Sequence, residues 1–159
     1  MRRNGAGRLR IIAGEWRSRL LPVLDQPGLR PTPDRVRETL FNWLQTVVPG
    51  ARCLDLFAGS GALGFEAASR GAAHVTMVEN QARACAQLAA NIKSLKTQKI
   101  ELIQQDAVGW LAQCEQQYEV VFIDPPYASG LLADTCRLLE HKGCLVNLSL
   151  IHISEPTRL

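Results

Sequence analysis

The spacing of hydrophobic positions changes near residue 52. Before it, residues 9–17 and 20–23 form two apolar runs around a turn, which predicts a short β-hairpin. A helix is predicted next, starting near residue 34 with Asp34 or Thr32 as its cap, because apolar residues recur at helical spacing. Those apolar positions are Val36, Leu40, Phe41, Trp43, Leu44 and Val47.

From residue 52 onward, strand patterns alternate with helix patterns. Strands are predicted at 53–57, 74–79, 99–104 and 118–124, helices at 62–69, 81–94, 108–114 and 131–140, and a further extended stretch at 143–146. This alternation predicts an α/β fold with a mostly parallel sheet, helices on both faces, and ligands at the carboxyl ends of the strands. Asp55, Glu79 and Asp124 stand at three of those ends.

The composition is that of an ordinary globular domain, with 159 residues, 47% hydrophobic and 21% charged. No apolar run is long enough for a transmembrane helix, and the N-terminus lacks the apolar core of a signal peptide, so we expect a cytoplasmic protein without membrane contact. Five cysteines without a C-x-x-C pair are expected to be small buried thiols. His74 and His141 have no metal-ligand spacing, and no metal is expected.

Positive charge is concentrated at the N-terminus. Residues 1–37 contain nine arginines, no lysine and three acids, a net charge of +6, while the whole chain carries +3. Arginine-rich arms suit phosphate, and therefore indicate a nucleic acid partner. The alternative is a solvated and poorly ordered N-terminus.

A glycine motif follows the first strand of the α/β region. Residues 55–64, DLFAGSGALG, contain the spacing G-x-G-x-x-G between a predicted strand and helix, and Glu79 lies 18 residues after Gly61. Glycines let the backbone turn tightly near a ligand, and an acid about 20 residues later can accept hydrogen bonds from ribose hydroxyls. The spacing alone fits a nicotinamide-dependent dehydrogenase as well as a methyltransferase.

The D-x-F-x-G-x-G form of this motif resembles motif I of the S-adenosylmethionine-dependent methyltransferases, whose fold is Rossmann-like. The resemblance implies that Asp55, Gly59 and Gly61 line the methionine part of the cofactor, together with Phe57. It also implies that Glu79 holds the ribose and that Asp106 accepts the adenine amine. The structural alternatives are that Asp55 caps the Gly59 turn and that Asp106 caps the helix after it.

A second motif, Asp124-Pro125-Pro126-Tyr127, closes the fourth strand and resembles the [DN]-P-P-[YF] motif of methyltransferases that act on exocyclic amines of nucleobases. Such an amine is a poor nucleophile because its lone pair is delocalised into the ring. The Asp124 carboxylate and the Pro125 carbonyl can accept its hydrogens in a backbone that prolines make rigid, and Tyr127 can stack on the base.

The guanine edge offers two donors to a carboxylate, whereas adenine offers one donor and one acceptor. This favours guanine without excluding adenine, because DNA adenine-6-amino methyltransferases also use D-P-P-Y.

Residues 10–19 (RIIAGEWRSR) and 29–44 (LRPTPDRVRETLFNWL), with the two motifs above, resemble the bacterial small-subunit (16S) ribosomal RNA guanine-N(2)-methyltransferases of the RsmD type. The resemblance implies methylation of one guanine in 16S rRNA, within assembled or partly assembled small subunits, by a protein expected to be a monomer. The residues expected to contact RNA are Arg10, Arg17, Arg19, Arg30, Arg35 and Arg37. Two rival functions stay open: an adenine-6-amino DNA methyltransferase and a non-catalytic rRNA-binding assembly factor.

Three regions are expected: a basic arm and hairpin (1–37), an incomplete methyltransferase core (38–147) and a tail (148–159). The family implies a seven-stranded sheet of order 3-2-1-4-5-7-6, and this chain has about one strand left after the fourth. Residues 148–159 resemble the translation of a sequencing adapter, so we expect a C-terminally truncated core with an artefactual tail. Residues 148–153 are apolar enough to occupy a fifth-strand position, and the exposed sheet edge predicts poor solubility and no activity for the chain as written.

Overall fold

The computed structural model describes residues 7–24, 33–125, 131–143 and 150–152. The predicted alternation of strands and helices is confirmed, and two elements have the predicted bounds, α2 and β4. The elements in chain order are β1 (Arg8–Arg10), β2 (Leu20–Pro22), α1 (Asp34–Trp43), β3 (Arg52–Asp55), α2 (Ala62–Ser69), β4 (His74–Glu79), α3 (Ala82–Leu95), β5 (Ile100–Gln104), α4 (Ala107–Gln113), β6 (Val120–Ile123), α5 (Leu131–Lys142) and β7 (Leu150–His152).

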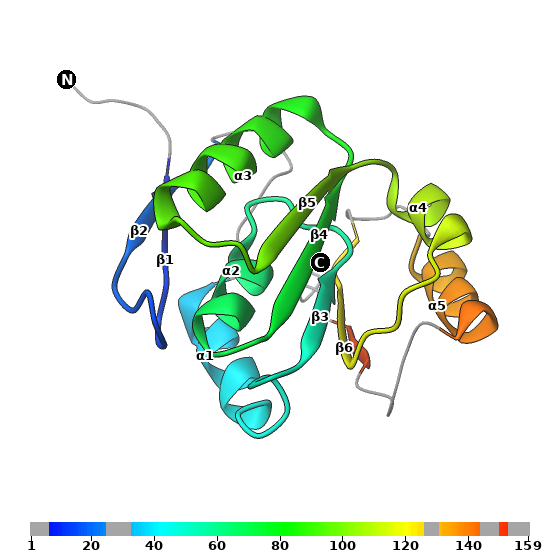
Figure 1. Ribbon diagram of the computed structural model, residues 1–159, viewed down its shortest axis with the longest axis horizontal. Coiled ribbons are helices and arrows are strands. Elements are labelled where there is room, and N and C mark those ends of the chain that lie inside the picture. The colour runs from blue at the N-terminus through cyan, green and yellow to red at the C-terminus, as the bar shows by residue number, and fades with distance from the viewer. Residues whose placement is uncertain (1–6, 25–32, 126–130, 144–149, 153–159) are drawn as a thin grey trace, which may run out of the picture.

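The main sheet has five strands in the order β5-β4-β3-β6-β7, all paired in parallel (Figure 1). These are the first five positions of the strand order that the family resemblance implied. β3 lies between β4 and β6, so the chain leaves three neighbouring strands at the same edge of the sheet, at Asp55, Glu79 and Asp124. The predicted meeting of strand ends is therefore confirmed.

Helices cover both faces of the sheet, as predicted (Figure 1). Side chains of β3 alternate between the faces: Cys53 belongs to a core shared with the hairpin, α1, α2 and α3, while Leu54 belongs to a second core shared with α4 and α5. Strands that are buried on both faces are continuous apolar runs in the sequence. The strands of this sheet could therefore be recognised from those runs.

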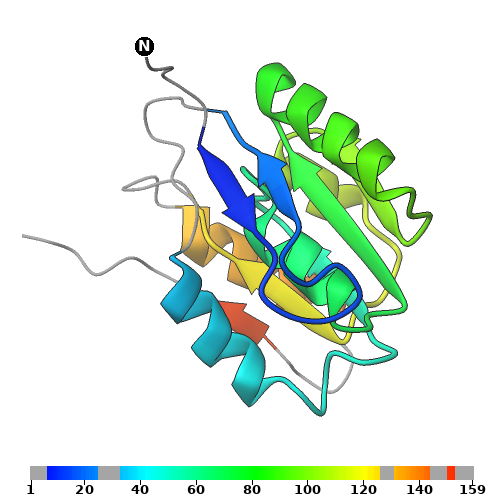
Figure 2. The same ribbon diagram turned by 90° about the vertical axis from the view of Figure 1, so that its left-hand side faces the viewer.

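β1 and β2 form the predicted antiparallel hairpin, and Figure 2 shows it between α1 and α3. Trp16, in the loop that joins the two strands, is buried at 6% exposure. The Asn91 side chain of α3 donates a hydrogen bond to the Pro22 carbonyl over 2.9 Å. The hairpin is therefore packed on the domain and does not extend into solvent as an isolated arm.

One local prediction on α1, the cap at Asp34, is wrong. The residue before the helix is Pro33 and no side chain caps it, because Asp34 is the first helical residue and its carboxylate turns to Arg37 instead; Thr32 lies outside the described residues. Of the six apolar positions, Leu40, Phe41 and Leu44 are buried, whereas Val36, Trp43 and Val47 are exposed.

Residue 143 is a turn, and residues 144–146, predicted to be extended, lie outside the described residues. The last described strand is β7, which pairs with β6 and occupies the position that the apolar pattern at 148–153 allowed. Within the described part of the chain, no helix combines the length and the apolar character needed to cross a membrane.

Candidate active site

The loop between β3 and α2 lies across the carboxyl edge of the sheet. The Leu56 N–H donates to the Phe122 carbonyl at the end of β6, and the Ala58 N–H donates to the Val78 carbonyl of β4. Gly61 has φ of 84°, and a Cβ at this position would lie 2.5 Å from Cε2 of Phe65. Glycine is therefore required at Gly61 both by its left-handed backbone and by close packing.

Asp55 lies under this loop and is 2% exposed. Its Oδ2 accepts a hydrogen bond from the Gly64 N–H over 3.0 Å, which holds the first turn of α2 against β3. The pKa of the Asp55 carboxyl is raised to about 7: burial raises it most, the Gly64 N–H opposes this, and the carboxylates of Asp124 and Glu79 add to it. A lining role toward methionine stays a prediction; the contact present in the structure is with Gly64.

Glu79 is half-buried at the end of β4 and supports the same loop. Its Oε1 accepts the Gly59 N–H over 2.8 Å and its Oε2 accepts the Gln81 N–H over 3.0 Å. A carboxylate has about four acceptor positions, so two remain for further donors such as ribose hydroxyls.

Asp124 and Pro125 follow β6 and are half-buried beside the glycine loop. In the parallel pairing of β3 with β6, Asp55 lies opposite Phe122, so Asp124 follows two residues later at the same end of the sheet. Its negative charge raises the pKa of Asp55. Pro126 and Tyr127, the rest of the predicted catalytic motif, lie outside the described residues.

Asp106 has the role that the structural alternative gave it. Its Oδ2 accepts the Gly109 N–H over 2.8 Å and caps α4, and the residue is exposed at the same edge of the sheet. A contact with an adenine amine remains a prediction for its other acceptor positions. Phe57 is half-buried and packs against the core that α4 and α5 share.

Among the arginines predicted to bind RNA, Arg10 and Arg17 of the hairpin and Arg35 of α1 are exposed. Arg19 is exposed as well, and its Nη2 donates to the Ser94 carbonyl of α3 over 3.3 Å. Arg30 lies outside the described residues.

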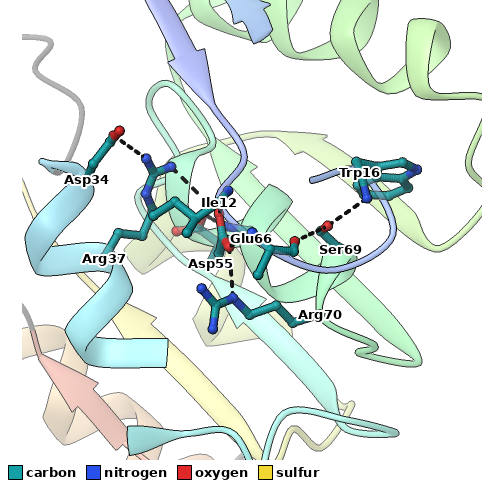
Figure 3. Close-up of polar contacts among 10 residues, drawn as sticks. Ile12, Trp16, Asp34, Arg37, Asp55, Glu66, Ser69 and Arg70 are labelled. Carbon is teal, nitrogen blue, oxygen red and sulfur yellow. Dashed lines mark hydrogen bonds and ion pairs between the residues drawn. The ribbon is translucent and has the colours of Figure 1, made fainter. Parts of the chain in front are cut away.

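The prediction for Arg37 is wrong, because this residue is fully buried. Its Nη2 lies 2.6 Å from Oδ1 of Asp34, and its Nη1 lies 3.8 Å from Oε1 of Glu66 (Figure 3). A signal was present in the sequence: Arg37 is on the helical face that carries the buried Leu40, Phe41 and Leu44. A guanidinium on that face points into the protein and cannot reach RNA phosphates.

No group of three or more metal-ligating side chains occurs within the described residues. His74 lies 3.4 Å from the exposed Glu101. Cys53, Cys85 and Cys114 are buried free thiols as predicted, Cys136 is half-buried, and Cys144 is outside the described residues.

Known proteins are similar to this chain over nearly its whole length. A family model described as "Conserved hypothetical protein 95" matches residues 9–159. The ribosomal RNA small subunit methyltransferase D of Escherichia coli (strain K12) is 51% identical over 152 residues, which are 96% of this chain and 77% of that protein. The chain belongs to the ribosomal RNA small subunit methyltransferase D family.

Other family members and solved structures agree. The methyltransferase D of Haemophilus influenzae is 46% identical over 94% of this chain and 80% of its own length. The solved structure of Escherichia coli yhhF has a TM-score of 0.86 at 48% identity and covers 96% of this chain and 85% of that one. Family membership decides between the cofactor classes that the glycine spacing left open, in favour of the methyltransferases.

A more distant structure, solved with SAH (S-adenosylhomocysteine), has a TM-score of 0.64 at 21% identity and covers 85% of this chain and 39% of that one. It shows that the fold is shared.

The carboxyl edge fits the cofactor of methyltransferases by the chemistry of its groups. Three carboxylates meet there, and Asp55 is pushed toward the neutral form by burial and by its acidic neighbours. A ligand with positive charge and hydroxyl donors stabilises the ionised form of these carboxylates. S-adenosylmethionine has such groups: a sulfonium, an ammonium and a ribose. The fit rests on Glu79 as the acceptor for hydroxyls and on the glycine loop as the backbone that a ligand can approach closely.

One buried residue was missed by sequence reasoning. Glu66, in the middle of α2, is fully buried and accepts backbone hydrogen bonds from Ile12 and Ala13. The available signal was the composition of residues 62–69, which are small or apolar on every side of the predicted helix. A helix that is apolar all round is buried all round, and an acid in it must find partners inside the protein.

Proposed function

We propose that this protein transfers a methyl group from S-adenosylmethionine to the exocyclic 2-amino group of a guanine in small-subunit (16S) ribosomal RNA. The observation that carries the proposal is the meeting of Asp124 and Pro125 with the Asp55–Glu79 glycine loop at one edge of the sheet. Membership in the methyltransferase D family, whose members' names state small-subunit ribosomal RNA, supports the substrate.

Each group at the edge has a separate task. The cofactor supplies an electrophilic methyl group on a sulfonium. Glu79 accepts hydrogen bonds from the ribose hydroxyls, Asp106 faces the adenine amine, and the loop around Gly59 and Gly61 leaves room for the methionine part. Asp55 fixes the loop through Gly64 and adds negative charge beneath it.

Asp124 and Pro125 orient the target amine. The Asp124 carboxylate accepts hydrogens from the guanine ring N–H and the 2-amino group, and the Pro125 carbonyl accepts the second amine hydrogen. Holding both hydrogens favours a nitrogen whose lone pair points at the methyl group. In direct in-line transfer the N–C bond would form as the S–C bond breaks, S-adenosylhomocysteine would leave, and the amine would give up one proton to water, without a covalent enzyme intermediate. Tyr127, by its place in the motif, stacks on the extruded base.

The hairpin and α1 face the RNA. Arg10, Arg17 and Arg19 are exposed on or next to the hairpin and Arg35 on α1, and Arg30 completes the set by its place in the sequence. Guanidinium groups bind phosphate through paired N–H donors. We further propose that the protein acts as a cytoplasmic monomer on the small ribosomal subunit, without a metal ion.

Labelled methyl transfer tests the proposal. The 159-residue chain, and a protein translated from the genomic gene read past the Asn147 codon, are each incubated with labelled S-adenosylmethionine and small-subunit particles, naked 16S rRNA or duplex DNA. Digestion to nucleosides then identifies the product. Labelled 2-methylguanosine from ribosomal RNA is expected with the protein from the genomic gene and not with the 159-residue chain. With the genomic protein, 6-methyladenine in DNA contradicts the substrate, and RNA binding without any labelled nucleoside favours the assembly-factor alternative.

A further inference from the structure

The Glu66 carboxylate joins three separate elements. Its Oε1 accepts the Ile12 N–H over 3.0 Å and its Oε2 accepts the Ala13 N–H over 3.1 Å, both in the loop of the hairpin. Arg70, one turn further along α2, donates from Nε to Oε2 over 2.8 Å. Arg37 brings α1 to the same group, with Nη1 3.8 Å from Oε1 (Figure 3).

A second contact from α2 holds the same loop. The Ser69 hydroxyl accepts the Trp16 N–H over 2.9 Å and donates to the Ala13 carbonyl over 2.6 Å. Gly14 sits so close to α2 that a Cβ there would lie 2.0 Å from the Ser69 carbonyl oxygen, and its φ is 90°. Backbone groups of residues 12–16 are therefore bound by two side chains of one buried helix.

These contacts fix the hairpin relative to the candidate active site. α2 begins at Ala62, directly after Gly61 of the cofactor loop, and Glu66 lies on its second turn. Ile12 follows the exposed Arg10 by two residues, and Arg17 and Arg19 lie just beyond the bound loop. The exposed arginines of the hairpin are thus connected to the cofactor loop through a rigid helix.

Burial explains why this connection has a fixed geometry. Glu66 and Arg37 are each fully buried, and among the described residues Nε and Nη1 of Arg37 have no hydrogen-bond partner. Buried ion pairs often add little net stability, and their best-attested use is to specify one arrangement among several. Two backbone N–H donors and two guanidinium groups around one carboxylate specify a single position of the hairpin and α1 on α2.

We propose that Glu66 is a positioning residue for RNA: it sets the arginine-bearing hairpin, and α1 beside it, in register with the methyl-transfer edge. This inference rests on the proposed function. Transfer requires the target nitrogen close to the methyl group, and misplacement by about 1 Å lowers rates strongly. A hairpin that shifts on α2 binds the RNA less well or in the wrong place, while the cofactor loop stays intact.

The test separates charge balance from hairpin anchoring. In Arg37→Met, Glu66 keeps Arg70 and both backbone donors. In the double variant Arg37→Met/Glu66→Gln, both buried charges of the pair are removed, but one of the two carboxylate oxygens becomes an NH2 group, which cannot accept. Because Ile12 and Ala13 donate to different oxygens, one of these two N–H groups then faces a donor in place of its acceptor. Comparing these two proteins isolates the anchor. Arg10→Ala/Arg17→Ala is the control that removes hairpin charge and leaves the anchor untouched.

Three quantities are measured for each protein: the Kd for 16S rRNA at fixed salt, the Kd for S-adenosylhomocysteine, and hydrogen exchange at the Ile12 and Ala13 amides. Relative to Arg37→Met, the double variant is expected to bind RNA roughly three- to tenfold more weakly, because only the anchored fraction is competent. Exchange at the two amides is expected to be faster, and cofactor affinity unchanged. Equal RNA affinity of the two proteins overturns the inference.

Ser69→Ala keeps the test decisive if the double variant does not fold. This change removes one neutral hydroxyl from the same anchor and leaves Glu66 and both arginines in place. We expect a smaller loss of RNA affinity with unchanged cofactor binding, and an unchanged RNA Kd contradicts the inference. If Arg10→Ala/Arg17→Ala also binds RNA normally, the hairpin is not the RNA-binding element, and the proposed function fails at that step. That result differs from failure of the anchor alone, in which this control variant loses RNA affinity.

Discussion

Two buried carboxylates at α2, Asp55 beside the helix and Glu66 within it, have neighbours of opposite charge. Asp55, 2% exposed, accepts one hydrogen bond among the described residues, from Gly64, and the charged groups that act on it are two further acids. Glu66 is fully buried, but two backbone N–H donors and two guanidinium groups surround it. One site collects negative charge and the other is neutralised within the protein.

The difference distinguishes a ligand-binding site from a structural contact. We call the Glu66 carboxylate and the groups bound to it, from Ile12, Ala13, Arg37 and Arg70, the junction. Negative charge that the fold leaves uncompensated at a ligand-binding edge destabilises the empty protein and favours a positively charged ligand. Charge that is compensated inside the protein keeps elements in place whether or not a ligand is bound. The following experiments break or sharpen this comparison, beginning with the largest expected effect.

Neutralising the junction is expected to cost the most stability. Glu66→Gln removes the buried counter-charge of Arg37 and leaves it only the exposed carboxylate of Asp34. Breaking a buried pair from one side costs about 3–5 kcal/mol of unfolding free energy. Urea denaturation measures this loss. The control is Asp134→Asn, because the ion pair of Asp134 with Arg137 is exposed on both sides, at 55% and 69%, and exposed pairs contribute about 0–1 kcal/mol. Similar losses for both variants contradict a special role for the junction.

At the edge of the sheet, the main effect is expected on chemistry and not on folding. Asp124→Ala removes the acceptor proposed for the target amine, and loss of one such group lowers rates roughly 10²–10³-fold. Single-turnover methyl transfer measures the rate, with melting temperature and RNA affinity expected to stay near those of the parent. Glu115→Gln, an exposed acid before β6, serves as the control. A rate loss below about threefold would show that Asp124 does not contact the reacting amine.

The stability of the protein should depend on pH through Asp55. The pKa of this carboxyl is about 7 in the folded protein against an ordinary value of 3.8. Between these values the folded protein binds more protons than the unfolded chain, so the contribution of Asp55 is most favourable at low pH and is lost as pH rises through about 7.

Asp55→Asn removes this dependence and keeps an acceptor for Gly64. The melting temperature of the variant, relative to the parent, is expected to increase steadily from about pH 4 to about pH 8. A constant difference across that range means that Asp55 is ionised in the folded protein throughout. The negative charge at this edge would then be neutralised by other groups, as that of Glu66 is.

The smallest effect is expected at Asp106, which has two candidate roles. Asp106→Ala removes the cap of α4, which costs about 1 kcal/mol, and also the predicted adenine contact. Asp106→Ser keeps a capping hydroxyl but is too short for that contact. We expect Asp106→Ser to melt at the temperature of the parent but to bind S-adenosylhomocysteine more weakly. If the serine variant also binds it as tightly as the parent, Asp106 only caps α4.

The predictable part of the fold was the part with strong local patterns. α2 and β4 were predicted at their observed bounds because apolar strands alternate with small-residue helices and glycine turns. Asp55, Glu79 and Asp124 could be grouped without coordinates, since parallel strands end at a common edge. The wrong predictions concern side chains whose partners are distant in sequence or whose local signal was ambiguous: Arg37, taken for an RNA contact, and Asp34, taken for a cap.

The sequence by itself determined the α/β order, the glycine loop, the acids at its strand ends and the family. The first three features depend on periods and spacings within a few tens of residues, and the family is what the resemblance of the motifs implies. Only the tertiary structure decided which charges are inside. Glu66 meets Ile12 from 54 positions away and Arg37 from another helix, and the cost of burying a charge is set by such distant partners, which no local pattern records.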